Sequence, residues 1–321
     1  MKTRIVYMGT PEFAVLPLQA LLEQGCSVVG VVCQPDRPQG RHMRLEPPPV
    51  KKLAAARGIP VLQPEKVRTP DFEAALRALN PELIVTAAYG RILPPNILAV
   101  PRYGCLNVHA SLLPAYRGAA PIQWSLIKGE RETGVTIMLM DEGMDTGDIL
   151  VQEKMAIPED MDAACLSEQL SRLGARILPE TVDRWLAGTL QRRPQNAADA
   201  SPAPLMSREA GQVDWTMTAE QIHNLIRGTY PWPGAYTWCG DKKLKIHRAG
   251  INRDPEICRT AAGLPAGTLC VCGAGTMSVA CGEGVLDLLE IQSESGKRLH
   301  CRDCAHNYRL GQKMGGGSHV D

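Results

Sequence analysis

The chain has 321 residues, enough for two domains that each bury a core. Its 35 Lys and Arg nearly balance 34 Asp and Glu, which excludes an overall basic field, so any RNA contact must come from local patches. No apolar run approaches the ~18 residues that span a membrane, and too few apolar residues follow the charged start for a signal peptide. The 11 Cys are scattered, so we expect a reduced, cytoplasmic protein.

The first half of the chain alternates strand-like and helix-like patterns. Short apolar runs typical of strands buried on both faces occur at residues 4–8, 27–33, 82–87 and 105–109. Thr10 as N-cap and Pro11 at the first helical position predict a helix that Gly25 closes, although Pro17 limits how early it begins. A second helical pattern covers Asp71 to Leu79. The alternation predicts an α/β fold with a Rossmann-like parallel sheet, which binds ligands at the carboxyl ends of its strands.

The second half opens with a long helix, predicted from Ala163 to Leu186 by apolar residues at helical spacing. Residues 189–205, rich in Gln, Asn, Ala, Ser and Pro, follow as an interdomain linker. A helix at 218–227 and short strand candidates at 235–238, 243–246, 268–272, 277–280 and 285–291 then indicate a small β-barrel or sandwich. The expected organisation is a first domain over 1–188, a linker over 189–205, a second domain over 206–314 and a disordered tail over 315–321.

Two loops carry the chemistry. The strand-like run at 105–109 delivers Asn107 and His109 to the start of a loop punctuated by Pro and Gly. A second loop, residues 141–148, follows a strand-like run at 136–140 and carries Asp145. Asn, His and Asp at strand ends polarise a carbonyl group and accept a proton without a metal.

The sequence of these loops resembles that of the folate-dependent formyltransferases. The matching patterns are Asn-Val-His-x-Ser-Leu-Leu-Pro-x-x-Arg-Gly from Asn107 and Asp-x-Gly-x-Asp-x-Gly from Asp141, and the likeness extends over about residues 3 to 311. It implies that a formyl group is transferred from 10-formyltetrahydrofolate by Asn107, His109 and Asp145, without a metal. It also implies a five-stranded OB-like barrel as the second domain. The folate contacts that it implies come from Ser111, Leu112, Leu113, Pro114, Arg91, Ile92, Leu93, Glu142 and Gly143, where Gly143 lets the ligand approach the backbone.

Formyl transfer is the attack of an amine on a formamide-like carbon. It needs a donor for the oxyanion and a route for the amine proton. Asn107 and His109 are two residues apart on one strand, so their side chains share a face and their N–H groups can converge on one oxygen. Asp145 can orient His109 and take the amine proton directly or through water. Arg117, in the first loop, is as compatible with a structural role as with a functional one.

Members of the family differ in the amine that they formylate, and three features favour methionyl-initiator tRNA. Residues 34–49 resemble the loop that wedges into the acceptor stem, although His42-Met43-Arg44 replaces a common Gly-Lys-Lys. The second feature is an alternating basic strand at residues 242–248, because a basic strand in an OB-like barrel contacts nucleic-acid phosphates. The Pro231-Trp-Pro233 motif fits the family's second domain but is shared with some enzymes of sugar nucleotides. The residues expected to bind tRNA are Arg37, Arg41, Arg44, Lys242, Lys243, Lys245 and Arg248.

Four alternatives stand beside this interpretation. A formyltransferase acting on an amino-sugar nucleotide would lack the loop at 34–49, and an inactive RNA-binding module would not need Asn107, His109 and Asp145. Dinucleotide binding is disfavoured because G-x-G-x-x-G is absent and Gln34-Pro35 stands where an acidic residue would end the strand. Zinc at Cys270, Cys272, Cys301 and Cys304 is the lesser alternative to ordinary thiols. We expect a monomer.

Overall fold

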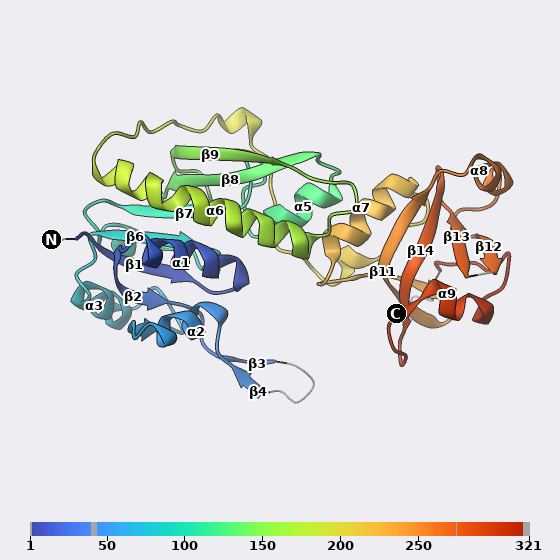
Figure 1. Cartoon of the computed structure of the whole chain (residues 1–321), viewed down its shortest axis with the longest axis horizontal. Helices are drawn as coiled ribbons and strands as arrows, with labels where there is room; N and C mark the ends of the chain where they lie inside the picture. The colour runs from blue at the N-terminus through green and yellow to red at the C-terminus, as the bar shows by residue number, and fades with distance from the viewer. Residues whose placement is uncertain (1, 40–43, 274, 317–321) are drawn as a thin grey trace. The chain divides into compact units, whose positions relative to one another are not determined.

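The structure is a computed structural model that describes residues 2–39, 44–273 and 275–316 (Figure 1). The chain divides into two compact units. The first unit comprises Met1–Pro121, Glu132–Ala156 and Ser167–Pro204, and the second comprises Ile122–Arg131, Ile157–Leu166 and Leu205–Asp321. Two segments of the predicted first domain, 122–131 and 157–166, therefore group with the later part of the chain, whereas the predicted linker up to Pro204 belongs to the first unit.

The first unit is built on a seven-stranded sheet with the order β5-β2-β1-β6-β7-β8-β9. Its strands are β1 (Arg4–Gly9), β2 (Ser27–Val32), β5 (Val61–Leu62), β6 (Leu83–Ala87), β7 (Cys105–His109), β8 (Glu132–Leu139) and β9 (Ile149–Ala156). The pairs from β5 to β7 are parallel, which confirms the predicted α/β sheet, but β8 pairs antiparallel with both neighbours. The antiparallel edge corrects the wholly parallel prediction. Residues 140–148 between β8 and β9 are shorter than the crossover of about a dozen residues that a parallel pair needs.

Helices cover both faces of this sheet. They are α1 (Val15–Glu23), α2 (Pro49–Ala56), α3 (Pro70–Ala78), α4 (Pro95–Leu98) and α6 (Ala163–Leu186), with α5 (Pro121–Ile127) at the boundary of the units. The helix predicted to start after Thr10 instead begins as a 3-10 turn, Glu12–Ala14, before α1. This start places Pro17 in the first turn of α1, where its missing N–H breaks no hydrogen bond.

Two apolar layers pack against the strands. On one face, Phe72 and Leu76 of α3 and Ile97 of α4 pack with residues of β1 and β6 such as Val6 and Ile84. On the other face, α1 and α6 lie side by side (Figure 1). There a Cβ on Gly174 of α6 would lie 2.9 Å from Val108 on β7, so this glycine allows the helix to approach the strand that carries Asn107 and His109.

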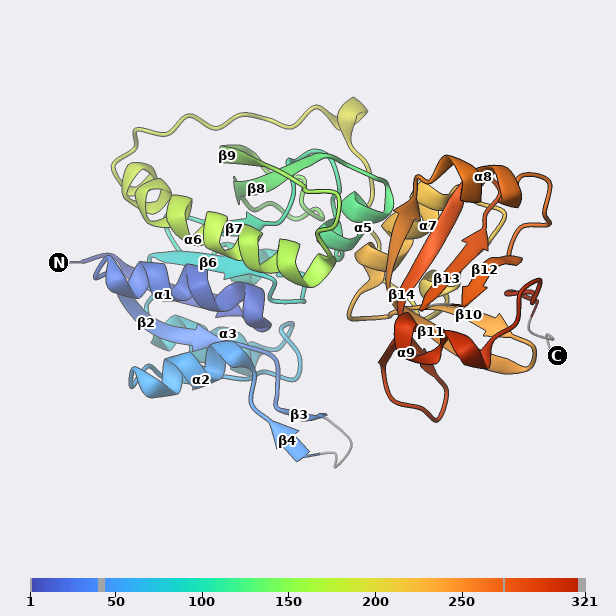
Figure 2. The same cartoon turned by 45° about the vertical axis from the view of Figure 1, so that its right-hand side comes forward.

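The second unit holds an antiparallel sheet with the path β10-β11-β14-β13-β12, and β15 pairs with β14 (Figure 2). Its elements are α7 (Ala219–Thr229), β10 (Ala235–Cys239), β11 (Lys242–Asn252), α8 (Pro255–Ala261), β12 (Leu269–Gly273), β13 (Thr276–Ala280), β14 (Val285–Ser293), β15 (Leu299–His300) and α9 (Cys301–Cys304). The C-terminal segment bridges both ends of this path, because Met314 pairs with Cys239 and Lys313 with Thr268. The predicted small β domain is confirmed.

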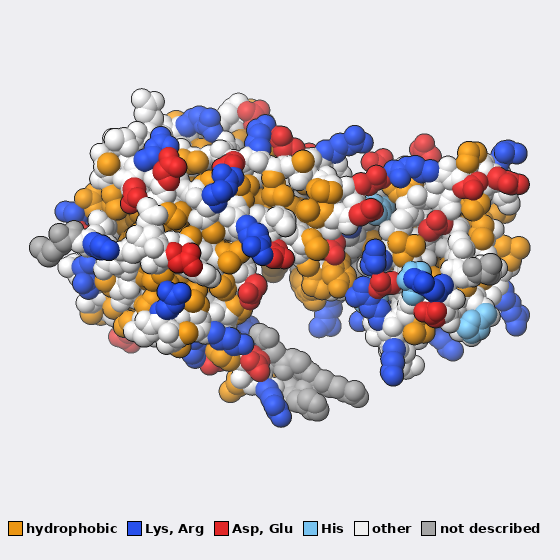
Figure 3. All heavy atoms as spheres, viewed as in Figure 1, with side chains coloured by type: hydrophobic (Ala, Val, Ile, Leu, Met, Phe, Trp, Pro, Cys, Tyr) orange, Lys and Arg blue, Asp and Glu red, His pale blue; other side chains and the backbone are white. Residues whose placement is uncertain are grey.

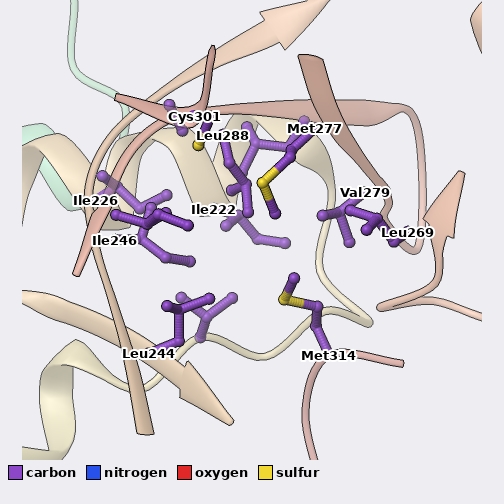
Figure 4. Close-up of a cluster of buried hydrophobic side chains, with 14 of the residues drawn as sticks. Ile222, Ile226, Leu244, Ile246, Leu269, Met277, Val279, Leu288, Cys301 and Met314 are labelled. Atoms are coloured by element: carbon purple, nitrogen blue, oxygen red, sulfur yellow. The ribbon is translucent and has the colours of Figure 1, made fainter. Parts of the chain in front are cut away.

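The larger apolar core of this unit packs against the sheet (Figure 4). Ile222 and Ile226 of α7 and Leu244 and Ile246 of β11 are almost fully buried. The helix is held at its start by a capping box between Thr218 and Gln221. The apolar side chains of α7 pack against the face of β11 that carries Leu244 and Ile246. The alternate residues of β11 therefore face outward.

The described end of the chain packs against the second unit. Met314 is 1% exposed, and the N–H of Gly315 donates to the carbonyl of Trp238 at 2.8 Å. Gly315, included in the predicted tail, therefore packs against β10. Residues 317–321 of that tail lie outside the described residues.

The segment predicted as a Pro-rich loop contains a short hairpin. β3 (Arg37–Gln39) pairs antiparallel with β4 (Arg44–Glu46), and Arg37 lies opposite Glu46. Arg37 and Arg44 are exposed, whereas Arg41 lies outside the described residues. Helix α2 then anchors the segment through Val50, which is fully buried.

Candidate functional site

Strand β7 presents Asn107 at the carboxyl edge of the sheet in a fixed orientation. It pairs with Thr86 of β6, whose hydroxyl donates to Asn107 Oδ1 at 2.7 Å. Thr86 is only 3% exposed, so water does not compete freely for this hydrogen bond. Since Oδ1 faces Thr86, the N–H donors of Asn107 are on the side of the amide that faces away from it.

His109 ends the same strand and is 5% exposed. Its Nε2 lies 3.0 Å from the carbonyl oxygen of Tyr116. A carbonyl only accepts, so this contact places a proton on Nε2 and leaves Nδ1 to contact other groups. Nδ1 lies 3.7 Å from Oδ1 of Asp145.

Asp145 comes from the loop between β8 and β9. Its second oxygen, Oδ2, accepts a hydrogen bond of 2.9 Å from the N–H of Gly118, which fixes the carboxylate and turns Oδ1 toward His109. The side chain is 17% exposed. Its backbone has φ +55°, in the left-handed region that non-glycine residues seldom adopt. Strained backbone of this kind persists where neighbours hold it, and it is frequent at functional sites.

The residues Ser111 to Pro114, expected to contact folate, divide into two groups. Ser111 is fully buried, and its hydroxyl donates to the carbonyl of Ala115 at 2.6 Å. Leu113 is 3% exposed, with its carbonyl bonded to Gln152. These two residues support the loop from within. Leu112 and Pro114 are partly exposed and offer apolar surface.

The other two segments expected to hold the pterin consist mostly of exposed residues. Ile92 is 51% and Met144 is 54% exposed, whereas Leu93 is buried. Arg91, Glu142 and Gly143 are also exposed. The structure gives a further reason for Gly143, because a Cβ there would lie 2.0 Å from Thr146 Oγ1. The glycine is required by the turn that Asp141 forms through hydrogen bonds to Gly143 and Thr146.

A pocket of about 460 Å³ lies at the carboxyl ends of β1, β2 and β6. Asn107, His109 and Asp145 do not line it, so it is a neighbouring feature of the same sheet edge rather than the space between the three side chains. The pocket brings together Arg91, expected to contact folate, and Arg37, expected to contact tRNA. Its lining residues are Thr10, Pro11, Gln34, Pro35, Arg37, Glu46, Pro48, Pro49, Gly90 and Arg91.

The predicted RNA-binding strand, β11, is only partly free to bind an anion. Lys242 and Lys245 are exposed, and Nζ of Lys243 lies 3.5 Å from the centre of the Tyr236 ring. Arg248 instead pairs with Glu290 at 3.3 Å. Strict alternation along β11 would place Arg248 on the same face as Leu244 and Ile246, which point into the core. A register shift between Ile246 and Arg248 turns Arg248 outward instead. On the face drawn in Figure 3, Lys and Arg are interspersed with Asp and Glu, in keeping with the balanced charge.

Three of the four late cysteines bond to the backbone. The thiols of Cys270, Cys272 and Cys304 donate to the carbonyls of Ser278, Ala305 and His300. Burial raises the pKa of the Cys301 thiol to about 12, which disfavours the thiolate that zinc would require. Within the described ranges, no group of three or more His, Cys, Asp or Glu side chains is arranged to hold a metal ion. Among the same residues, no helix is long and apolar enough to cross a membrane.

Sequence reasoning missed two residues of the site. Thr86 is the one polar side chain in the apolar run Leu83–Ala87, and this contrast was a usable signal. Gln195 donates to the carbonyls of Asp145 and Gly147 and accepts from Arg117. It sits in a polar segment without periodicity, so no local signal marked it. Two nitrogens of the Arg117 guanidinium donate to Gln195, which favours a structural role for this residue.

Comparison with known sequences gives two family matches. Residues 1–182 match the family described as formyl transferase, and residues 205–309 match the formyl transferase C-terminal domain. A methionyl-tRNA formyltransferase of Geobacter metallireducens is 49% identical over 306 residues, which cover 95% of this chain and 96% of that protein. One from Citrifermentans bemidjiense is 50% identical over 308 residues, which cover 96% and 94%.

Solved structures share the fold at lower identity. WlaRD, a sugar 3N-formyl transferase solved in the presence of dTDP and 5-N-formyl-THF, has a TM-score of 0.66 at 16% identity, covering 92% of this chain and all of that one. HypX from Aquifex aeolicus, solved with tetrahydrofolic acid, has a TM-score of 0.61 at 17% identity, covering 94% of this chain and 46% of that one. A methionyl-tRNA formyltransferase from Clostridium thermocellum has a TM-score of 0.53 at 17% identity, covering 78% and 94%.

Proposed function

The chain belongs to the methionyl-tRNA formyltransferases, and on that premise we propose that it transfers the formyl group of 10-formyltetrahydrofolate to the α-amino group of methionyl-initiator tRNA. The observation that supports this reaction most strongly is the arrangement of Asn107, His109 and Asp145 at one edge of the sheet. We include a cytoplasmic, monomeric enzyme in the proposal.

Asn107 is assigned to the oxyanion. As the amine attacks the formyl carbon, negative charge develops on the formyl oxygen, and an N–H that is already oriented stabilises it without reorganisation. The hydroxyl of Thr86 holds Oδ1 and so presents the N–H side of the amide for this purpose. The donor is therefore preorganised before any substrate binds.

His109 and Asp145 are assigned to the protons. The attacking amine must lose a proton, and the departing folate nitrogen must gain one. Asp145 Oδ2 is bonded to the N–H of Gly118, and His109 Nε2 to the carbonyl of Tyr116. The two remaining atoms, Asp145 Oδ1 and His109 Nδ1, face each other at 3.7 Å. Asp145 takes the amine proton, directly or through water, and relays it to Nδ1 of His109, which supplies it to the leaving folate nitrogen, so that no proton is gained or lost overall.

The two substrates are assigned to different sets of residues, and Arg91 of the folate set and Arg37 of the tRNA set line the same pocket. Exposed Ile92 and Met144, with Leu112 and Pro114, offer apolar area for the flat pterin, beside the predicted contacts of Arg91, Leu93, Glu142 and Gly143. Arg37, Arg44, Lys242, Lys243 and Lys245, together with Arg41 outside the described residues, are assigned to the tRNA backbone. The contribution of Arg248 is smaller in this assignment because its guanidinium already pairs with Glu290.

An acceptor comparison tests the proposal. Purified protein is incubated with 10-formyltetrahydrofolate and either methionyl-initiator tRNA or a nucleotide-linked amino sugar, and the formylated product of each is quantified. Formylation of the tRNA alone is expected. Formylation of the sugar nucleotide alone would show that the amino sugar is the acceptor. RNA binding without any transfer would instead support the alternative of an inactive RNA-binding module.

A further inference from the structure

Residues 193–203, which we call the strap, run alongside the loops that hold His109 and Asp145. Ile149 and Arg193 exchange two backbone hydrogen bonds, of 2.8 and 2.9 Å. Further along, the N–H of Arg117 donates to Ser201 and its carbonyl accepts from Ala203. A flexible connector would not make such ladders, so the strap is a docked part of the first unit.

Gln195 joins both loops through one side chain. Its Nε2 donates to the carbonyl of Asp145 at 2.8 Å and to that of Gly147 at 2.7 Å. Its Oε1 accepts from Nε of Arg117 at 3.0 Å and from Nη2 at 2.8 Å. Both donors and the acceptor of the carboxamide are therefore used inside the protein, which leaves the amide one orientation.

The strap also holds the two strained residues of the site. Asp145 has φ +55° and Tyr116 has φ +61°. Side chains disfavour this conformation, so it requires support from neighbouring groups. Gln195 holds the carbonyl of Asp145, and Ser201 Oγ accepts from the N–H of Tyr116 at 2.9 Å. The carbonyl of Tyr116 is the partner of His109 Nε2.

We propose that Gln195 is a positioning residue for formyl transfer, which keeps Asp145 in its left-handed conformation and so keeps the carboxylate facing His109. For its effect on activity this inference rests on the proposed function. Gln195 acts through Asp145 and is not assigned a contact with either substrate.

The test uses the full-length protein with Gln195→Leu, which removes the amide at similar volume. Without its anchor the Asp145 loop samples other conformations, so kcat is expected to fall by about 10- to 100-fold, while KM for tRNA changes by less than about threefold. Hydrogen–deuterium exchange over residues 141–148 is expected to accelerate at least about tenfold. Gln195→Glu, which retains the acceptor for Arg117 but loses both donors, is expected to behave in the same way, and thermal melting checks that both variants fold.

Gln191→Leu is the matched control, because Gln191 is an exposed residue of the same polar segment, and it is expected to leave kcat and exchange at parental values. Introduced into Asp145→Asn, Gln195→Leu is expected to cost less than about threefold in kcat, since the group that it positions is already gone. Parental exchange over 141–148 in both Gln195 variants, or an undiminished cost in the Asp145→Asn background, would overturn the proposal. Exchange requires no turnover, so a protein that fails to formylate tRNA would refute the proposed function while exchange still decides the role of Gln195.

Discussion

Thr86→Val tests whether Asn107 acts as an oriented donor. Valine keeps the shape of threonine and removes the hydroxyl that donates to Asn107 Oδ1 at 2.7 Å. A neutral, buried hydrogen bond contributes about 1 kcal/mol, and that amount corresponds to roughly fivefold in rate if it is needed to orient the amide. We therefore expect kcat to fall about fivefold, with the KM for folate and for tRNA nearly unchanged.

Asn107→Ala sets the scale for this effect. Removal of the oxyanion donor itself is expected to cost about 3 kcal/mol, on the order of 10² to 10³ in kcat. If Thr86 acts only through Asn107, Thr86→Val adds less than about twofold in the Asn107→Ala background. The two single substitutions thus differ by at least an order of magnitude, whereas the double substitution resembles Asn107→Ala.

The assay is the initial rate of labelled formyl transfer to methionyl-initiator tRNA at saturating concentrations of both substrates. Thr181→Val is the control, because Thr181 is also a buried threonine whose hydroxyl bonds to a carbonyl, that of Ile177 on α6. It is expected to leave kcat unchanged while costing a similar amount of stability. Parental kcat in Thr86→Val, or additive losses in the double variant, would refute the assignment of an oriented Asn107 donor.

Three further outcomes are expected. Dialysis against a strong chelator should leave kcat unchanged, since amide, imidazole and carboxylate supply every assigned role; a loss restored by zinc would contradict this. Replacing Lys243 or Lys245 with Ala should weaken tRNA binding modestly and lower its salt slope by about one unit for each lost phosphate contact, and an unchanged slope would remove that residue from the RNA surface. Burial raises the pKa of the Cys33 thiol to about 11 and that of the Cys105 thiol to about 12. Both thiols should therefore stay protonated and resist alkylation at neutral pH, and they should react only as the pH rises toward those values or when the protein unfolds. Exposed Cys165 should react first, and mass spectrometry reads the order.

Local sequence was sufficient where one strand or one turn fixed the outcome. Asn107 and His109 are two residues apart on a five-residue strand, so the pattern alone placed them on β7. The long helix from Ala163 to Leu186 was predicted with its observed bounds because its apolar spacing persists over many turns. The antiparallel edge at β8 and β9 was not predicted, because apolar runs alone do not reveal strand direction.

Contacts between distant segments could not be predicted. Gln195 reaches the carbonyl of Asp145 from a position 50 residues away in sequence, out of a segment whose composition indicated only a linker. Ser111, a polar residue expected to contact folate, is fully buried and its hydroxyl donates to the carbonyl of Ala115. In both cases the sequence gives the kind of side chain, but only the fold decides which way it points.

The most direct test of the account is the rate of formyl transfer by Asp145→Asn at saturating substrates. The substitution is nearly isosteric, and its amide oxygen can still accept from Gly118 in place of Oδ2, so the loop is expected to keep its shape. What is lost is the proton acceptor facing His109, and a general base contributes about 10² to 10⁴ in rate. We expect kcat to fall by at least about 10² with folate and tRNA binding retained. Near-parental kcat would contradict the assignment of Asn107, His109 and Asp145 as the residues that carry the reaction.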